Sequence, residues 1–387
     1  MLTRLADARS VLPGLLTLAA CALYGIVFLL AESQAEVLGL VAGALVAVWL
    51  LARVDWAGRA RISFATHPRT LQALSAAAVL AALAVFRGEH FPLLMLASVL
   101  FYTTACLGLT VQFGFAGVVN FAGAAFFGIG AYTAAVMVAH TPVPHLCVMI
   151  LGGLASALVG SALILPVLRT RGHYAALVTI AFGILFRTFI EVNDVLGGPQ
   201  GLQVKGMNLF GWDLNSPVAI GDQALSFYAN YVVIAFGLAA AAFVVVRRLE
   251  RSWLGLNLDA VRLDETVCAV FGIEVGRWKV VAFTVGNFLA GTAGAAYAQM
   301  VGFVAPNSFT FGDSLILVSI VILGGMGNPW GVALAAAIVI VLPEKLQALQ
   351  EYRFLLYACL VIAILLFRPG GLLPRRTREY FPDWRPR

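Results

Sequence analysis

The sequence predicts an all-α polytopic membrane protein with about 10–12 transmembrane helices, some of them broken or re-entrant. Composition is the first reason, because 61% of its 387 residues are hydrophobic and only 11% are charged, whereas about a quarter of an average globular sequence is charged. The second reason is that the apolar residues form long runs, such as 11–31, and a run of about 18 or more apolar residues can span a bilayer. The third is a one-sided distribution of basic residues among the loops.

The candidate spans follow from the apolar runs. The first run comes after Arg4 and Arg9, as in a signal peptide, but it exceeds the usual apolar region of about 7–15 residues, so we interpret it as a retained span. Two late runs, 313–323 and 330–343, are short enough to be half-helices around a re-entrant loop. The predicted spans lie near 11–31, 35–52, 71–87, 92–111, 119–139, 146–167, 174–190, 227–246, 280–300, 313–323, 330–343 and 354–367.

Basic residues distinguish the two sides of the membrane. Of the 25 Lys and Arg residues, 20 fall in one set of alternate loops, and Arg187 lies within a span. The positive-inside rule therefore places both termini and the loop 252–279 in the cytoplasm, and the loop 191–226 outside. This distribution explains the net charge of +6 without nucleic acid as a partner. The opposite loops hold Arg87, Lys205, Lys345 and Arg353.

Small residues recur every four positions in the predicted span 280–300, which is the spacing of helix interfaces. Such stripes let helix backbones approach closely in lipid, so they predict tight helix packing. Asn287 lies one residue into the stripe, where an amide can bond across helices. Arg187 is close enough to a helix end to pair with Glu191 one turn later. The stripe consists of Gly286, Ala290, Gly294 and Ala298.

Two segments, 112–132 and 323–331, are too rich in glycine for plain spans. Non-helical backbone at membrane depth survives only where it is buried in protein or lines a cavity, and broken helices often surround a transporter's substrate path. Gln112, Asn120 and Asn328 are the polar candidates for a translocation path there. The alternative is that both segments are ordinary cytoplasmic turns.

Motifs for catalysis and for metal binding are missing from the sequence. None of the three lysines follows a glycine, so there is no P-loop for a nucleotide, and no HExxH, GxSxG or paired carboxylates occur within a span. The five cysteines are scattered singly, without a CxxC or Cys/His cluster. We therefore expect neither an enzyme, a metal site nor a bound cofactor, and active transport would draw its energy from an ion gradient or from another subunit.

The loop 252–279 concentrates charge in a chain that otherwise avoids it. Val261, Val267 and Val270 share a face at helical spacing, Asp259, Asp264 and Glu265 lie early in that helix, and Gly272 suits its C-terminus. A helix lying on the membrane surface would have a basic polar face. This one is acidic, so we favour a short cytoplasmic helix that docks into a groove on a cytosolic partner.

This loop and several other motifs, taken in order, resemble the permeases of branched-chain amino-acid ABC importers. The loop stretch is AVRLDETVCAVFGI (260–273), the resemblance covers about 95–373, and it is greatest to the longer of two homologous permease subunits. Leu263 and Asp259 depart from the usual loop pattern, and the first 90 residues match poorly. The other motifs are GFAGVVNFAGAAFFGIGAY (114–132), LRTRGHYAALVTIAFGILFR (168–187), GGPQGL (197–202), KVVAFTVGNFLAGTAGAAYA (279–298), PNSFTFGDSLILVSIVILGGMGNPWG (306–331) and FRPGGLL (367–373).

The resemblance implies a subunit of the bacterial inner membrane that works with others. A cytosolic ABC ATPase would hydrolyse ATP, a second permease would complete the membrane part, and a periplasmic binding protein would deliver the substrate. The loop would couple to the ATPase through Arg262, Asp264, Glu265 and Gly272. The chain would then divide into an N-terminal extension of about three spans, the permease domain and a basic cytoplasmic tail, at 1–90, 91–373 and 374–387.

Two other functions remain open at this point. A secondary, ion-coupled transporter also suits a dozen spans with both ends inside, but such carriers place carboxylates within spans, and none lies well inside one here. Importers of urea and short amides have the same type of permease, so a branched-chain or other hydrophobic amino acid is the first of several candidate substrates.

Overall fold

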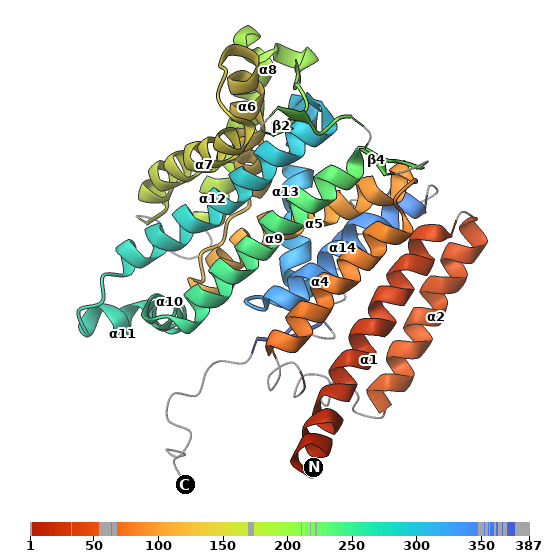
Figure 1. Cartoon of the computed structure of the whole chain (residues 1–387). Coiled ribbons are helices and arrows are strands. Elements are labelled where there is room, and N and C mark those ends of the chain that lie inside the picture. Colours follow the sequence, from red (N-terminus) through yellow and green to blue (C-terminus); the bar gives the residue numbers. More distant parts are fainter. Residues whose placement is uncertain are drawn as a thin grey trace. The chain divides into compact units, whose positions relative to one another are not determined.

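The computed structural model describes most of the chain, and Figure 1 shows its course. The described ranges are 2–31, 33–53, 68–168, 174–209, 211–216, 218–220 and 223–346, together with residues 63, 352, 355, 357–359, 361–362, 366 and 370–375. The chain divides into two compact units. Unit 1 comprises 1–96, 217–232 and 343–350, and unit 2 comprises 97–216, 233–342 and 351–387.

The predicted fold class is confirmed. Each predicted span from 11–31 to 330–343 coincides with a helix, and eight helices of the described part are long and apolar enough to cross a membrane. Half of the residues of the span predicted at 354–367 lie outside the described part of the chain. The long helices are α1 (Leu2–Leu30), α2 (Gln34–Arg53), α4 (Pro68–Val85), α5 (His90–Thr110), α6 (Gly123–His140), α7 (His145–Leu168), α8 (Tyr174–Val192), α9 (Tyr228–Arg251), α12 (Val275–Val301), α13 (Phe311–Gly324) and α14 (Pro329–Lys345).

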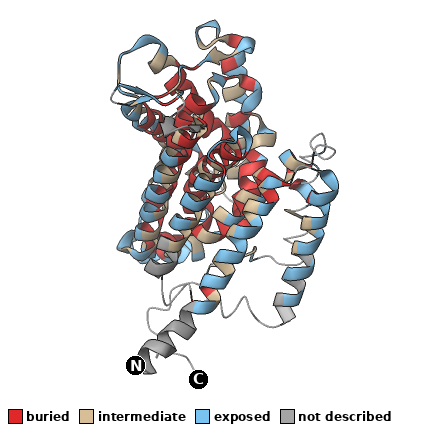
Figure 2. Ribbon diagram, turned by 45° about the vertical axis from the view of Figure 1, so that its right-hand side comes forward, coloured by how far each residue is buried: buried red, intermediate tan, exposed pale blue. Residues whose placement is uncertain are grey.

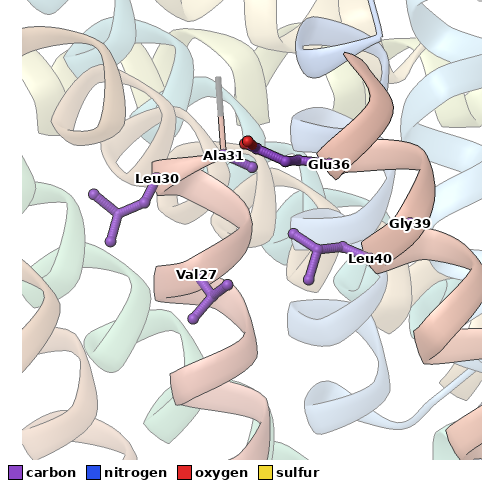
Figure 3. A pocket seen from close by; sticks show the side chains of 6 residues that line it. All are labelled: Val27, Leu30, Ala31, Glu36, Gly39 and Leu40. Atoms are coloured by element: carbon purple, nitrogen blue, oxygen red, sulfur yellow. The ribbon is translucent and has the colours of Figure 1, made fainter. Parts of the chain in front are cut away.

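Unit 1 contains the N-terminal helices, of which α1 packs against α4. Lys345 donates hydrogen bonds from Nζ to the carbonyl oxygens of Leu29 (2.6 Å) and Ala31 (2.9 Å), where a cation offsets the negative end of the α1 dipole. An open groove separates α1 from α2. Figure 3 shows it lined by apolar side chains with one carboxylate, and its residues are Val27, Leu30, Ala31, Glu36, Gly39 and Leu40.

Unit 2 is built around α12, which packs against both α6 and α7. The helices touch through backbone atoms: a Cβ added at Gly130 would overlap Gly291, and one added at Gly294 would overlap the carbonyl oxygen of Phe127. Buried residues gather in this unit, whereas α1 of unit 1 is mostly exposed along its described side chains (Figure 2). Contact of this kind requires glycine, because any side chain would hold the helices apart.

The predicted external loop between α8 and α9 holds short elements. Two 3₁₀ turns (Asp194–Leu196 and Gly198–Gln200) precede β1 (Leu202–Gln203), which pairs antiparallel with β6 (Phe303–Val304). The strands β2 (Asn208–Leu209) and β3 (Trp212–Asp213) form a hairpin, as do β4 (Val218–Ile220) and β5 (Gln223–Leu225). Within unit 2, β2 lies at one end of α12 and the helices α10 (Trp253–Leu263) and α11 (Glu265–Val270) lie at the other (Figure 1).

The two glycine-rich segments both interrupt helices. The chain leaves α5 through a π-helical turn, η1 (Val111–Phe115), and has no helix from 116 to 122 before α6 begins. The second break separates α13 from α14, where Gly325 (φ 104°) and Gly327 (φ 92°) adopt backbone angles that favour glycine. At 14 residues, α13 alone rises about 21 Å, so its interpretation as a half-helix stays a prediction.

Candidate functional site

The non-helical segment 116–122 is the centre of the candidate site. It is held in unit 2 by side chains of other helices: Thr179 Oγ1 of α8 accepts a hydrogen bond from the backbone N–H of Phe121 (3.1 Å), and Ser314 Oγ of α13 accepts one from Ala124 (3.1 Å). These hydroxyl groups satisfy backbone donors near the start of α6 that no helical carbonyl can reach. The backbone of this segment can therefore stay non-helical inside the protein without the free-energy cost of unpaired N–H groups.

Three buried amide side chains meet at this break. Gln112 Nε2 donates to Asn287 Oδ1 (2.9 Å) and to the carbonyl oxygen of Phe283 (3.2 Å), and Gln112 Oε1 accepts from Asn120 Nδ2 (2.8 Å). Asn120 Oδ1 in turn accepts from the backbone N–H of Ala122 (2.9 Å). None of the three side chains is more than 1% exposed. We call this set, Gln112, Asn120 and Asn287, the amide cluster.

One donor of the amide cluster has no partner. Asn287 Nδ2 is buried and makes no hydrogen bond within the described structure. It lies against Gly160 of α7, where an added Cβ would overlap it. A buried donor without an acceptor costs about 1–3 kcal/mol. The cluster therefore has one hydrogen-bond donor that could bind a solute or water.

The structure brings together two of the three predicted path residues. Gln112 and Asn120 belong to the amide cluster, whereas Asn328 caps α14, where its Oδ1 accepts from the backbone N–H of Trp330 (3.1 Å). Asn287 was expected to bond across helices only as a packing residue, and its place beside Gln112 was missed. The sequence signal that could have found it is its place next to Gly286 of the stripe. A neighbouring helix that packs closely on the stripe also comes close to Asn287.

The stripe on α12 faces its neighbours as its spacing predicts. A Cβ added at Gly286 would overlap the carbonyl oxygen of Gly108 and the side chain of Gln112, and Gly294 lies on the backbone of Phe127. Ala290 and Ala298 are buried as well. The stripe thus supports the amide cluster from one side, because Gln112 has room only beside a residue without a side chain.

The loop 252–279 differs from the single helix that the sequence predicts. It forms two helices, α10 and α11, because Asp264 leaves the helical conformation (φ −158°, ψ 109°) and accepts hydrogen bonds from the backbone N–H groups of Thr266 (2.8 Å) and Val267 (3.0 Å). Asp259 is consequently inside α10 rather than early in the predicted helix. An aspartate that caps the next helix competes with continuation of the previous one.

The predicted helix end at Gly272 is confirmed. Gly272 has φ 77°, its N–H donates to the carbonyl oxygen of Ala269, and the N–H of Ile273 donates to that of Cys268. This is the Schellman arrangement, in which a glycine beyond the helix closes its last turn. Three large apolar side chains, at the ends of α10 and α11 and in the turn after α11, are exposed: Leu263 (74%), Val270 (81%) and Phe271 (79%). We call these three the apolar tip.

The other predicted coupling residues have internal contacts. Glu265 forms an ion pair with Lys279 at the start of α12 (2.6 Å). The side chain of Arg262 lies against Gly117 of the break, 3.0 Å from the position of an added Cβ. Arg187 pairs with Glu191 (3.9 Å), as its spacing predicts, and also donates to Asn307 (3.0 Å). Arg262 therefore connects the loop to the break rather than pointing only outward.

No group of three or more His, Cys, Asp or Glu side chains in the described ranges could hold a metal ion. The amide cluster consists of neutral groups, which can orient a polar solute by hydrogen bonds. Its amide groups lie in a core of apolar helices, as in a path for a small molecule with both apolar and polar parts.

Comparison with known proteins gives the family. Residues 91–366 match the model of the branched-chain amino acid transport system permease component. The chain belongs to this family. It is 36% identical over 287 residues to the high-affinity branched-chain amino acid transport system permease protein LivM of Salmonella typhimurium, covering 70% of this chain and 68% of LivM. For LivM of Escherichia coli the identity is 35% over the same shares.

A second type of relative is the LivH permease protein of the same transport system in Salmonella typhimurium, 22% identical over 293 residues, which are 72% of this chain and 92% of LivH. No solved structure matches this chain. Membership of the family confirms the resemblance, makes the chain a multi-pass membrane permease, and favours a transport subunit of an ABC import system over an ion-coupled carrier.

Proposed function

We propose that this permease forms part of the translocation path of an ATP-driven importer for branched-chain or other hydrophobic amino acids. The observation that carries the proposal is the 36% identity to LivM over 70% of the chain. The amide cluster supports it, because a path for such a substrate has to pass an apolar side chain together with a polar ammonium and carboxylate. The unpaired Nδ2 of Asn287 is the donor that would meet that polar end.

The partners follow from the same relationship. Likeness to both LivM and LivH supports pairing with a second, homologous permease in the membrane. A cytosolic ABC ATPase would supply the energy and the only bound nucleotide, and a periplasmic binding protein would supply the substrate. The chain would lie in the bacterial inner membrane with both termini in the cytoplasm, as the distribution of its basic residues predicts.

The helices α10 and α11 would be the element that docks on the ATPase. Leu263, Val270 and Phe271 of the apolar tip are exposed, and exposed apolar groups rimmed by charge mark interaction sites. The ion pair of Glu265 with Lys279 would hold α11 against α12. A partner that moves the tip would then move the start of a membrane-spanning helix.

Exchange of Arg262 and Glu265 together for alanine is expected to abolish uptake of radiolabelled leucine while the permease stays in the membrane. The reason is that Arg262 contacts the break at Gly117 and Glu265 holds Lys279 of α12, so the double change disconnects the loop from the spans. The measurement combines uptake in cells with gentle detergent purification and mass spectrometry of the proteins recovered with the chain.

The control for this variant is exchange of Arg248, which lies at the end of α9, for alanine. Recovery of a P-loop ATPase and a second permease with the wild-type chain would support the proposed function, and recovery of the chain alone would contradict it. Normal uptake by the double variant would contradict only the coupling role of the loop and would leave the proposed function of the permease intact.

A cysteine in place of Gln200 is expected to react with an impermeant thiol reagent from outside intact cells. Gln200 is an exposed residue of the loop between α8 and α9, which the positive-inside rule places outside. Cysteine in place of Val270, which is 81% exposed on the opposite end of unit 2, is the matched control and should react only after the membrane is broken. The native cysteines are first replaced by serine, and the reverse pattern would overturn the topology.

A further inference from the structure

Arg375, near the beginning of the C-terminal tail, is buried against four parts of unit 2. Only 7% of its side chain is exposed. Its Nη1 and Nη2 donate to the two carboxylate oxygens of Asp259 on α10 (2.6 and 2.9 Å), and its Nε lies 3.5 Å from a carboxylate oxygen of Glu250 on α9. Two parallel bonds from a planar guanidinium to one carboxylate form a geometrically specific pair.

The same guanidinium contacts the break that carries the amide cluster. Nη1 also donates to the carbonyl oxygen of Gly114 (3.3 Å), and the guanidinium carbon lies 4.2 Å from the centre of the Phe115 ring. Both residues belong to η1, the π-helical turn that begins at Val111 and includes Gln112. A cation over an aromatic face is attracted to it, and the attraction is stronger where water is excluded. Arg375 thus connects α10 directly to the turn that positions Gln112.

The chain that carries Arg375 is itself fixed. The backbone N–H groups of Leu372 and Leu373 donate to the carbonyl oxygens of Leu323 (2.8 Å) and Gly324 (3.2 Å) at the end of α13. The aliphatic part of Arg375 lies against Gly327, where an added Cβ would meet its Cδ at 2.5 Å. The second break therefore limits the movement of the arginine side chain. A displacement of Asp259 would consequently move Arg375 as a whole and, with it, its contacts to η1.

The charges around Arg375 balance, because two arginines face two carboxylates. Glu250 also pairs with Arg247 (2.9 Å), and the exposed fractions of the Glu250 and Asp259 side chains are 17% and 15%. A buried charge network of this kind is costly to leave half satisfied, because each remaining charge would lack a partner. It therefore favours one arrangement of α9, α10 and η1 and resists their independent movement.

We propose that Arg375 links the movement of α10 to the π-helical turn η1 and hence to the amide cluster. The inference rests on the proposed role of α10 and α11 in docking the ATPase. Movement of α10 on the ATPase would pull Asp259, Arg375 and the carbonyl of Gly114 together. Gln112 would then shift relative to Asn287 on α12, and the hydrogen bonds that close the cluster would open.

The experiment uses the whole purified importer in proteoliposomes and records leucine transported per ATP hydrolysed. Exchange of Arg375 for glutamine, or of Asp259 for asparagine, is expected to lower this ratio about tenfold, a usual size for coupling between sites, while unstimulated ATP hydrolysis per recovered complex stays unchanged. The double variant should be no worse than either single one, because both remove the same contact. Arg375→Lys keeps the charge without the planar fork and should recover part of the ratio.

Arg251→Gln is the matched control, because Arg251 is an exposed arginine of the last turn of α9, and it should leave the ratio unchanged. If Arg375→Gln does not assemble, Asp259→Asn and Arg375→Lys provide the comparison. A normal ratio in the assembled variants, or losses that multiply in the double variant, would overturn the link. Failure of the proposed function is distinguishable, because the wild-type importer would then not transport leucine. Failure of the docking role of α10 and α11 would instead appear as normal transport by the Arg262 and Glu265 double variant.

Discussion

Replacement of Gly294 by leucine is expected to remove most of the folded permease from the membrane. The carbonyl oxygen of Phe127 on α6 occupies the place of the new side chain, and a backbone atom cannot move aside as a flexible side chain can. Overpacking of a tight interface costs about 1–3 kcal/mol and sometimes more. The measurement is the amount of monodisperse protein in size-exclusion chromatography, together with its melting temperature.

Gly237→Leu provides the control for this prediction. Gly237 is an exposed glycine of α9, and an added Cβ there would meet nothing within 4 Å. The same change in residue type and volume should therefore leave protein yield and melting temperature close to those of the wild type. Equal yields of the Gly294 and Gly237 variants would contradict the close packing of α6 on α12.

Exchange of Gln112 for methionine is expected to lower leucine uptake strongly at an equal amount of assembled importer. Methionine keeps the length of the side chain but removes the acceptor of Asn120 Nδ2 and the donor to Asn287 Oδ1 and Phe283. Leaving these buried groups without partners costs about 1–3 kcal/mol, and 1.4 kcal/mol corresponds to about tenfold in an equilibrium constant. Uptake is measured in proteoliposomes and divided by the amount of complex recovered.

Gln299→Met is the matched control, since it makes the same chemical change at an equally buried glutamine of unit 2. Gln299 lies on α12, with no exposed surface, and it bonds His145 rather than the amide cluster. We expect its variant to assemble with near-normal uptake. If both glutamine variants transport equally well, or lose uptake in proportion to their stability, Gln112 has a structural role only.

The membrane helices were predictable because the bilayer constrains them strongly. A span has to satisfy its own backbone within an apolar run of fixed length, so the runs near 146–167 and 280–300 coincide with α7 and α12. The breaks were predictable for the opposite reason, because Gly114, Gly117 and Gly123 weaken a helix. Even so, the π-helical form of the turn at Val111–Phe115 depends on contacts that the local sequence does not contain.

The structure of the loop 252–279 was predicted only in part. Apolar spacing favoured one helix across 261–273, but it could not decide between Asp264 inside that helix and Asp264 capping a new one. In the structure Asp264 caps α11, because its carboxylate accepts the backbone N–H groups of Thr266 and Val267, which no helical carbonyl can reach. Gly272 was easier, because a glycine after an apolar periodic run is typical of a helix end.

The site was predictable where its residues are near neighbours in sequence. Gln112 lies in the π-helical turn η1 and Asn120 in the non-helical segment 116–122 that follows it, so their meeting follows from the break itself. Asn287 and Arg375 reach the same place from distant parts of the chain, and Arg375 meets Gly114 across 261 positions. Contacts of that kind arise from tertiary packing, and they cannot be predicted from the spacing of residues along the sequence.

The glycine contacts between α6, α7 and α12 restrict how this permease can change shape. Gly130 meets Gly291, Gly152 lies on Gly130, and Gly294 meets Phe127, all through backbone atoms. A backbone has no alternative rotamers with which to adapt to a shifted neighbour, so sliding one of these helices along another would bring it into steric collision. We therefore expect the three helices to move as a single rigid body during transport, with the rotation taken up at its edges, where the chain is not helical.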